Sequence, residues 1–211
     1  AHLAERAGVP KGAFSVITST RSAEIGAELT GNELVRKLTF TGSTAVGKIL
    51  MAQCAATIKK VSLELGGNDP IIVMEDADID EASSLAVQGS YKNSGQRCTA
   101  IKRMLVHESV ADAFTEQVVA KTKAWTFGDP SDPKVEMGTV IDEAAARLFE
   151  SRVNEAVSQG ARLLVGNERR GALYSPTVLD RVDPSMTVAR EETFGPVSPI
   201  VRFRNIDEAI R

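Results

Sequence analysis

The sequence has few of the residues that disulfide frameworks and metal centres require. Its 211 residues include two cysteines, Cys54 and Cys98, too few for a disulfide framework, which favours a reducing compartment. The two histidines, His2 and His107, are isolated from any residue at metal-ligand spacing. We therefore expect no metal site.

Neither charge nor hydropathy indicates a nucleic acid or a membrane as the partner. The formal net charge is -3 and there is no basic block, so we expect no nucleic-acid partner. No apolar run approaches the ~18 residues of a membrane-spanning helix. The composition, 43% hydrophobic and 25% charged, is ordinary for a soluble globular protein. Together with the cysteine usage, these features predict a cytoplasmic protein of one or two domains.

Both ends of the sequence are predicted to lie inside a larger fold. The opening segment lacks an initiator methionine and a signal-peptide apolar core, and it is predicted to be the end of a helix stopped by Gly8 and Pro10. Residues Ile206–Arg211 are predicted to open another helix. We therefore expect the chain to be a fragment of a longer protein.

Strands and helices are predicted to alternate along the chain. The predicted strands cover residues 14–18, 34–41, 58–65, 70–74, 101–107, 162–165, 174–179 and 197–203. The predicted helices cover residues 24–30, 43–56, 78–91, 110–125 and 142–159. Such alternation is typical of a parallel α/β layer with right-handed crossovers. A domain boundary is expected near Gly66 and Gly67, where one α/β unit closes and another begins.

Cys98 lies in a small, polar and cationic segment, Asn93–Ala100, which offers nothing for a cysteine to pack against. Arg97 directly precedes it, and a neighbouring cation favours the nucleophilic thiolate form of a cysteine. Upstream, Glu64 ends an apolar run just before two glycines, and we expect its carboxylate to be half-buried. A nucleophile and such a carboxylate are the groups that acyl-type chemistry needs. Glu64 as a member of a structural ion pair remains the alternative.

The segment Phe40–Lys48 joins a predicted strand to a predicted helix through a glycine turn. Free amides and the helix dipole at such a helix N-terminus suit a pyrophosphate. Gly47, one turn into the helix, would allow close packing of helix and sheet. Thr44 replaces the middle glycine of the usual G-x-G-x-x-G pattern, so a plain strand-to-helix turn capped by Ser43 is an equal alternative.

The segment Glu191–Val197 combines acids, an aromatic ring and a rigid turn. An acid can hold ribose hydroxyls, and an aromatic side chain can form the wall of a site for a planar ring. The alternative is an ordinary Gly-Pro turn that leads into a strand.

Four segments, FTGSTAVG, LELGGNDP, NSGQRCTA and EETFGPV, together resemble the aldehyde dehydrogenase superfamily. The similarity extends over essentially all 211 residues. It implies a Rossmann-type cofactor domain, an α/β catalytic domain and an oligomerisation arm. Residues 1–66 would be the C-terminal part of the NAD(P)-binding domain, and residues 67–211 a catalytic domain incomplete at its C-terminus.

The resemblance also implies a role for individual residues. The nucleophile corresponds to Cys98, and the general base that activates the hydrolytic water corresponds to Glu64. The implied cofactor-binding residues are Gly42, Ser43, Gly47, Leu65, Glu192 and Phe194. The implied cofactor is NAD or NADP, with NAD favoured, and the full-length protein would be a homodimer or homotetramer. Family residues that complete the oxyanion hole and hold the adenosine ribose would lie upstream of Ala1, so we expect the chain alone to be inactive.

Arg97 is the most informative residue for the substrate. Its guanidinium could hold the anionic head of an aldehyde next to the nucleophile, and a structural ion pair is the alternative. The segments Cys98–Val106 and Arg169–Thr177 resemble the phosphonoacetaldehyde dehydrogenases, which predicts oxidation of phosphonoacetaldehyde to phosphonoacetate. Non-phosphorylating glyceraldehyde-3-phosphate dehydrogenases and other acid-semialdehyde dehydrogenases remain alternatives.

Two functions of other kinds compete with this interpretation. A cysteine hydrolase would need a histidine base for Cys98, and only His2 and His107 are available. A packing or interaction domain that has lost activity is the non-enzymatic alternative.

Overall fold

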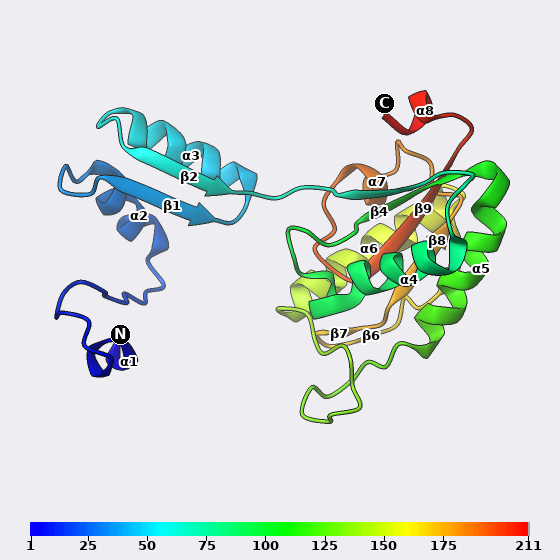
Figure 1. Ribbon diagram of the computed structural model, residues 1–211, viewed down its shortest axis with the longest axis horizontal. Coiled ribbons are helices and arrows are strands. Elements are labelled where there is room, and N and C mark those ends of the chain that lie inside the picture. The colour runs from blue at the N-terminus through cyan, green and yellow to red at the C-terminus, as the bar shows by residue number, and fades with distance from the viewer. Residues whose placement is uncertain (211) are drawn as a thin grey trace. The chain divides into compact units, whose positions relative to one another are not determined.

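The computed structural model describes residues 1–210, which form two compact units: an N-terminal unit, Ala1–Leu65, and a C-terminal unit that starts at Gly66 (Figure 1). The N-terminal unit contains α1 (His2–Arg6), α2 (Ser22–Gly31), β1 (Lys37–Thr41), α3 (Thr44–Ala55) and β2 (Lys60–Glu64). None of the helices in residues 1–210 is long and apolar enough to cross a membrane.

In the N-terminal unit, β1 and β2 pair in parallel and α3 connects them. The helix begins at Thr44 because the Ser43 hydroxyl caps it, accepting a hydrogen bond from the Val46 amide at 3.3 Å. The strand predicted over residues 14–18 is wrong, because this segment forms no strand and Phe14 and Ile17 are exposed. Apolar side chains alone do not make a strand, which also needs a partner for its backbone groups.

The C-terminal unit is built on a five-stranded sheet of order β3-β4-β9-β8-β5. The strands are β3 (Pro70–Val73), β4 (Arg103–His107), β5 (Arg162–Val165), β8 (Thr177–Asp180) and β9 (Val197–Phe203). The helices are α4 (Ile79–Tyr91), α5 (Glu108–Ala124), α6 (Glu143–Ser158), α7 (Thr187–Arg190), α8 (Ile206–Ile210) and the 3₁₀ helix η1 (Lys92–Gly95). β3, β4, β9 and β8 run parallel, as predicted, whereas β5 pairs antiparallel with β8 at the edge.

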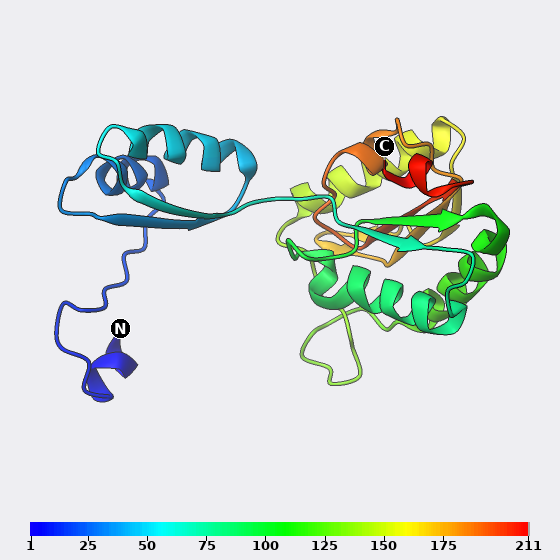
Figure 2. The same ribbon diagram turned by 45° about the horizontal axis from the view of Figure 1, so that its top comes forward.

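Helices cover both faces of this sheet, α4 and α5 on one and α6 and α7 on the other (Figure 1 and Figure 2). The strands therefore contribute to two cores, as the period-two alternation of side chains requires. On β9, Ile200 packs in the core with α4 and α5, and its neighbour Val201 packs in the core with α6 and α7. Loops, not helices, lie at the edge of the sheet where its parallel strands begin.

The predicted helix bounds agree with the structure to within two residues, but a second predicted strand, besides that of residues 14–18, is wrong. Residues 174–179 divide into the end of β7 (Leu173–Tyr174) and most of β8, separated by Ser175 and Pro176. Proline has no amide hydrogen, and the two pieces pair with different partners: β7 with β6 (Arg169–Arg170), and β8 with β5 and β9.

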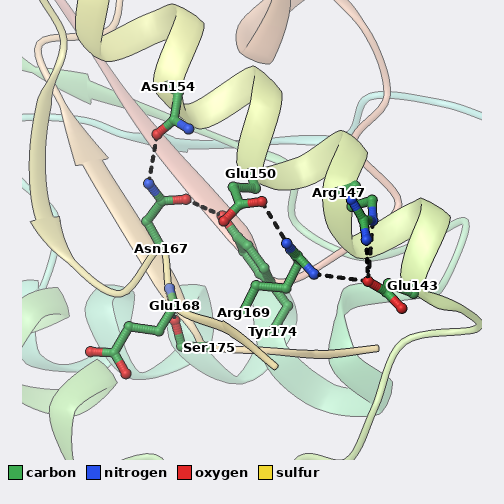
Figure 3. A network of polar contacts seen from close by, with 9 residues as sticks. All are labelled: Glu143, Arg147, Glu150, Asn154, Asn167, Glu168, Arg169, Tyr174 and Ser175. Carbon is green, nitrogen blue, oxygen red and sulfur yellow. Dashed lines mark hydrogen bonds and ion pairs between the residues drawn. The ribbon is translucent and has the colours of Figure 1, made fainter. Parts of the chain in front are cut away.

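The β6–β7 hairpin is fixed to α6 by a polar network (Figure 3). Arg169 Nε donates to Glu150 at 2.8 Å, and Arg169 Nη1 lies 3.2 Å from Glu143. The Tyr174 hydroxyl donates to Asn167 at 2.7 Å, and burial raises the pKa of Tyr174. Arg169, in a segment that carried the phosphonoacetaldehyde resemblance, is therefore engaged in holding the hairpin.

Candidate active site

The N-terminal unit brings the glycine turn and Glu64 together. Thr41 is in register with Glu64, and the Gly42 amide donates to the Glu64 carbonyl at 3.0 Å. Parallel neighbouring strands end at the same sheet edge, so both groups lie at the carboxyl ends of β1 and β2. Glu64 is exposed in this chain, not half-buried as predicted, because it ends a strand with one neighbour. Among the described residues it has no salt-bridge partner, so the ion-pair alternative gains no support.

The glycine turn is tightly packed. A Cβ on Gly47 would lie 2.5 Å from Leu65 Cδ2, and one on Gly42 would lie 2.5 Å from the Phe40 ring. A Cβ at either position would force the neighbouring side chain to shift, so glycine allows the close packing seen here. The Ser43 side chain accepts from the Val46 amide, and the Thr44 and Ala45 amides of the first α3 turn have no intrahelical partner. The turn thus fits the pyrophosphate of a dinucleotide at a helix N-terminus.

Three loops meet at the amino edge of the sheet in the C-terminal unit. Asp69, Lys102 and Pro196 directly precede β3, β4 and β9, which are parallel and adjacent in that order. The Lys102 amide donates to the Asp69 carbonyl at 3.0 Å. The GGNDP end of LELGGNDP and the segments NSGQRCTA and EETFGPV, distant in sequence, are thereby neighbours.

Cys98 is exposed, as its polar surroundings predicted, whereas Cys54 on α3 is buried. The loop before Cys98 has an unusual backbone, with three successive left-handed residues, Asn93, Ser94 and Gly95. A Cβ on Gly95 would lie 2.3 Å from the Gly195 carbonyl oxygen, so the cysteine loop and the EETFGPV loop are in direct backbone contact. This contact presents the thiol outward from a constrained loop.

Arg97 points back toward α4. Its Nη2 donates to the Gly89 carbonyl at 2.8 Å, near the C-terminal end of that helix. The Nε atom is buried and has no hydrogen-bond partner among the described residues. Arg97 is thus held by a backbone carbonyl, and none of the salt bridges in residues 1–210 includes it.

Glu192 and Phe194 differ in their exposure. Glu192 Oε1 is buried and lies 3.2 Å from Lys102 Nζ, while a Cβ on Gly66 would lie 2.3 Å from Glu192 Oε2. The Phe194 side chain is 44% exposed. The acid is therefore positioned by its surroundings, and the aromatic ring is free to contact a ligand.

Sequence reasoning missed Lys102 and Arg152. Lys102 Nζ donates to the Cys98 carbonyl oxygen at 2.7 Å, and Arg152 Nη1 donates to the Glu192 carbonyl oxygen at 2.8 Å. Both side chains also contact Glu192, which is distant from them in sequence, so residue spacing gave no signal for those two contacts.

The histidine base of a cysteine hydrolase is not present near Cys98 in the C-terminal unit. His107 ends β4, whereas Cys98 precedes the start of that strand. Its ring nitrogens contact Ser109 Oγ at 2.8 Å and the Arg204 carbonyl at 3.0 Å. Within residues 1–210, no group of three or more potential ligands among His, Cys, Asp and Glu could hold a metal ion.

A thiol on a constrained loop of a parallel α/β unit and a dinucleotide-type glycine turn define the kind of protein this is. The chain belongs to the aldehyde dehydrogenase family, whose pattern it matches over residues 1–211.

Particular relatives are similar along the whole chain. The 3-sulfolactaldehyde dehydrogenase of Pseudomonas putida is 46% identical over 211 residues, which are 99% of this chain and 43% of the relative. The NADP(+) succinate-semialdehyde dehydrogenase of Escherichia coli is 47% identical, with 99% and 43% covered. The crystal structure of succinate-semialdehyde dehydrogenase from Burkholderia pseudomallei superposes with a TM-score of 0.96 at 47% identity, covering 100% of this chain and 44% of that one. The chain thus spans less than half the length of these relatives.

Proposed function

We propose that the protein carrying this sequence oxidises a short anionic aldehyde to its carboxylic acid, with NAD or NADP as the oxidant. The observation that supports this most is the exposed Cys98 on a loop packed against the loop of Glu192. In this proposal residues 1–66 belong to the NAD(P)-binding domain and residues 67–211 to the catalytic domain.

Residues of each unit are proposed to bind the cofactor. The Gly42–Ser43 turn and the first α3 turn would bind the pyrophosphate, and Gly47 and Leu65 form the packed floor of that turn. Glu192 would accept hydrogen bonds from the ribose hydroxyls, and Phe194 would pack on the nicotinamide ring. When bound, the nicotinamide supplies the hydride acceptor.

The chemistry of the protein groups begins at Cys98. Its Sγ forms a bond to the aldehyde carbon, and the carbonyl oxygen becomes an oxyanion to which the Cys98 amide can donate. After hydride loss the carbon is a thioester. Glu64 then takes a proton from water, the water oxygen bonds to the thioester carbon, and Sγ leaves as the carboxylic acid is released.

The substrate class follows from the names of the relatives and from Arg97. Sulfolactaldehyde carries a sulfonate and succinate semialdehyde a carboxylate, so both are aldehydes with an anionic group. Arg97, next to the nucleophile, is the candidate cation for that group. Phosphonoacetaldehyde falls in the same chemical class, but the relatives' names favour carboxylate and sulfonate substrates.

An aldehyde panel with both cofactors tests this proposal on the full-length protein. Succinate semialdehyde, glutarate semialdehyde, sulfolactaldehyde and phosphonoacetaldehyde are compared with propanal by the absorbance of reduced nicotinamide. We expect kcat/KM to be highest for an anionic aldehyde. A preference for propanal would contradict the substrate class, and no reduction with any aldehyde would contradict the activity. Size-exclusion chromatography of the same preparation tests the proposed dimer or tetramer.

A further inference from the structure

Lys102 places a buried charge between two parts of the candidate site. Its side chain is only 2% exposed, although lysine is rarely buried. Its Nζ donates to the Cys98 carbonyl oxygen at 2.7 Å and lies 3.2 Å from Glu192 Oε1 and 3.8 Å from Asp69 Oδ2. One ammonium group therefore contacts all three loops at the amino edge of the sheet.

The energetics of this ammonium make its contacts interdependent. A buried charge is costly unless it is paired and hydrogen-bonded, and a lysine has three donors to satisfy. Here the Cys98 carbonyl accepts one hydrogen bond from the ammonium, and the carboxylates of Glu192 and Asp69 lie at ion-pair distances of 3.2 and 3.8 Å. Displacing either the Cys98 loop or Glu192 would leave a buried cation without part of its compensation.

The backbone explains why Lys102 reaches this position. Its own amide is bonded to the Asp69 carbonyl, which fixes the start of β4 against the start of β3. The side chain then extends along the amino edge of the sheet toward the residue four positions earlier, Cys98. Glu192 is held on its other side by Gly66, where a Cβ would collide with the carboxylate.

We propose that Lys102 is a positioning residue that couples the loop carrying Cys98 to Glu192, whose carboxylate would bind the cofactor. The inference rests on the proposed function, in which Glu192 holds the nicotinamide ribose and Cys98 attacks the aldehyde. Lys102 contacts neither ligand itself. It fixes the backbone from which the Cys98 thiol projects, and it transmits a change at Glu192 to that backbone.

The test compares two lysine variants of the full-length protein. Lys102→Met keeps the length of the side chain but removes its charge and donors. Lys121→Met is the matched control, because Lys121 also pairs with a carboxylate, Asp80, but joins α5 to α4. Two quantities are measured: the KM for NAD and NADP, and the rate at which iodoacetamide alkylates Cys98 with and without cofactor.

We expect Lys102→Met to raise the cofactor KM by about tenfold or more, the effect of removing one partner of a buried charge pair. In the wild type, cofactor should change the alkylation rate of Cys98, and this response should be lost in Lys102→Met and kept in Lys121→Met. A purely structural lysine would lower the melting temperature without abolishing the response.

The possible results distinguish a failure of the proposed function from a failure of the coupling through Lys102. A wild type without any nicotinamide reduction would contradict the proposed function, and the coupling with it. An active wild type whose Lys102→Met variant keeps both the cofactor KM and the alkylation response would overturn the coupling alone. If Lys102→Met does not fold, Glu192→Gln breaks the same bridge from the other side. Cys98 alkylation must then lose its response to cofactor, or the coupling is wrong.

Discussion

The two cysteines of this chain have opposite environments, and their substitutions should have opposite consequences. Cys98 is exposed on a loop, so Cys98→Ala should abolish aldehyde oxidation while leaving the melting temperature unchanged. Cys54 is 1% exposed, so Cys54→Ala should cost about 1 kcal/mol of stability and retain activity. Nicotinamide absorbance and thermal unfolding of the full-length variants measure both effects. Turnover retained in Cys98→Ala would rule out the thioester mechanism.

Arg97 has two possible roles that kinetics can separate. If its guanidinium binds the anionic head of the substrate, Arg97→Leu should raise KM for acid semialdehydes by about tenfold or more relative to propanal. If it only holds the end of α4 through the Gly89 carbonyl, charged and neutral aldehydes should be affected equally. Steady-state kinetics with one aldehyde of each kind decide between the roles.

Gly66 is a position where one methyl group should displace a functional carboxylate. Its Cβ would lie 2.3 Å from Glu192 Oε2, the end of a flexible side chain that can swing aside. We expect Gly66→Ala to fold normally and to raise the cofactor KM several-fold. Gly31→Ala is the matched control, because nothing lies within 4 Å of its Cβ. An unchanged cofactor KM in Gly66→Ala would show that Glu192 does not act from this position.

At the scale of elements, a buried tyrosine joins α4, α5 and β8. The Tyr91 hydroxyl lies 3.3 Å from Thr122 Oγ1 and 3.4 Å from the Thr177 carbonyl, and burial raises the pKa of Tyr91 from 10.0 to about 12. Because the pKa of Tyr91 is raised in the folded state, its protonated hydroxyl contributes about 3 kcal/mol to the free energy of unfolding below pH 10.0, the ordinary pKa of tyrosine. This contribution is lost as the pH rises to about 12.

Chemical denaturation across this pH range tests the tyrosine. The free energy of unfolding of the wild type should fall relative to Tyr91→Phe as the pH increases, since the phenylalanine variant has no proton to lose. Tyr174 is present in both proteins, so its ionisation contributes equally to the two free energies of unfolding and cancels in their difference. A constant difference between the two proteins would show that Tyr91 ionises as it does in the unfolded chain.

The elements themselves were largely predictable. Capping residues such as Ser43, Asp78 and Asp142 marked helix starts, and all three side chains accept hydrogen bonds from first-turn amides. The antiparallel direction of β5 and the hairpin at Arg169 were not predictable. Strand direction depends on which strand becomes the neighbour, and local sequence does not encode that choice.

At the scale of the whole molecule, the two protein groups proposed for thioester formation and hydrolysis belong to different units. Glu64 belongs to the N-terminal unit and Cys98 to the C-terminal unit. Glu64→Gln in the full-length protein should leave acylation of Cys98 intact and slow hydrolysis of the thioester by on the order of a hundredfold. We expect a burst of reduced nicotinamide and a mass increase on Cys98. Loss of the burst along with turnover would place Glu64 in an earlier step.

The sequence by itself determined the alternation of strands and helices and the helix caps, and it predicted a chemistry for Cys98, Glu64 and the glycine turn. These features depend on a residue and its close neighbours in the chain. Only the tertiary structure decided that Lys102 bridges Cys98 and Glu192, that Gly66 lies against that carboxylate, and that Arg97 turns back to α4. The contacts of Glu192 with Lys102 and Gly66 arise where parallel strands distant in sequence begin side by side, and the pairing of those strands is set by packing of the whole sheet.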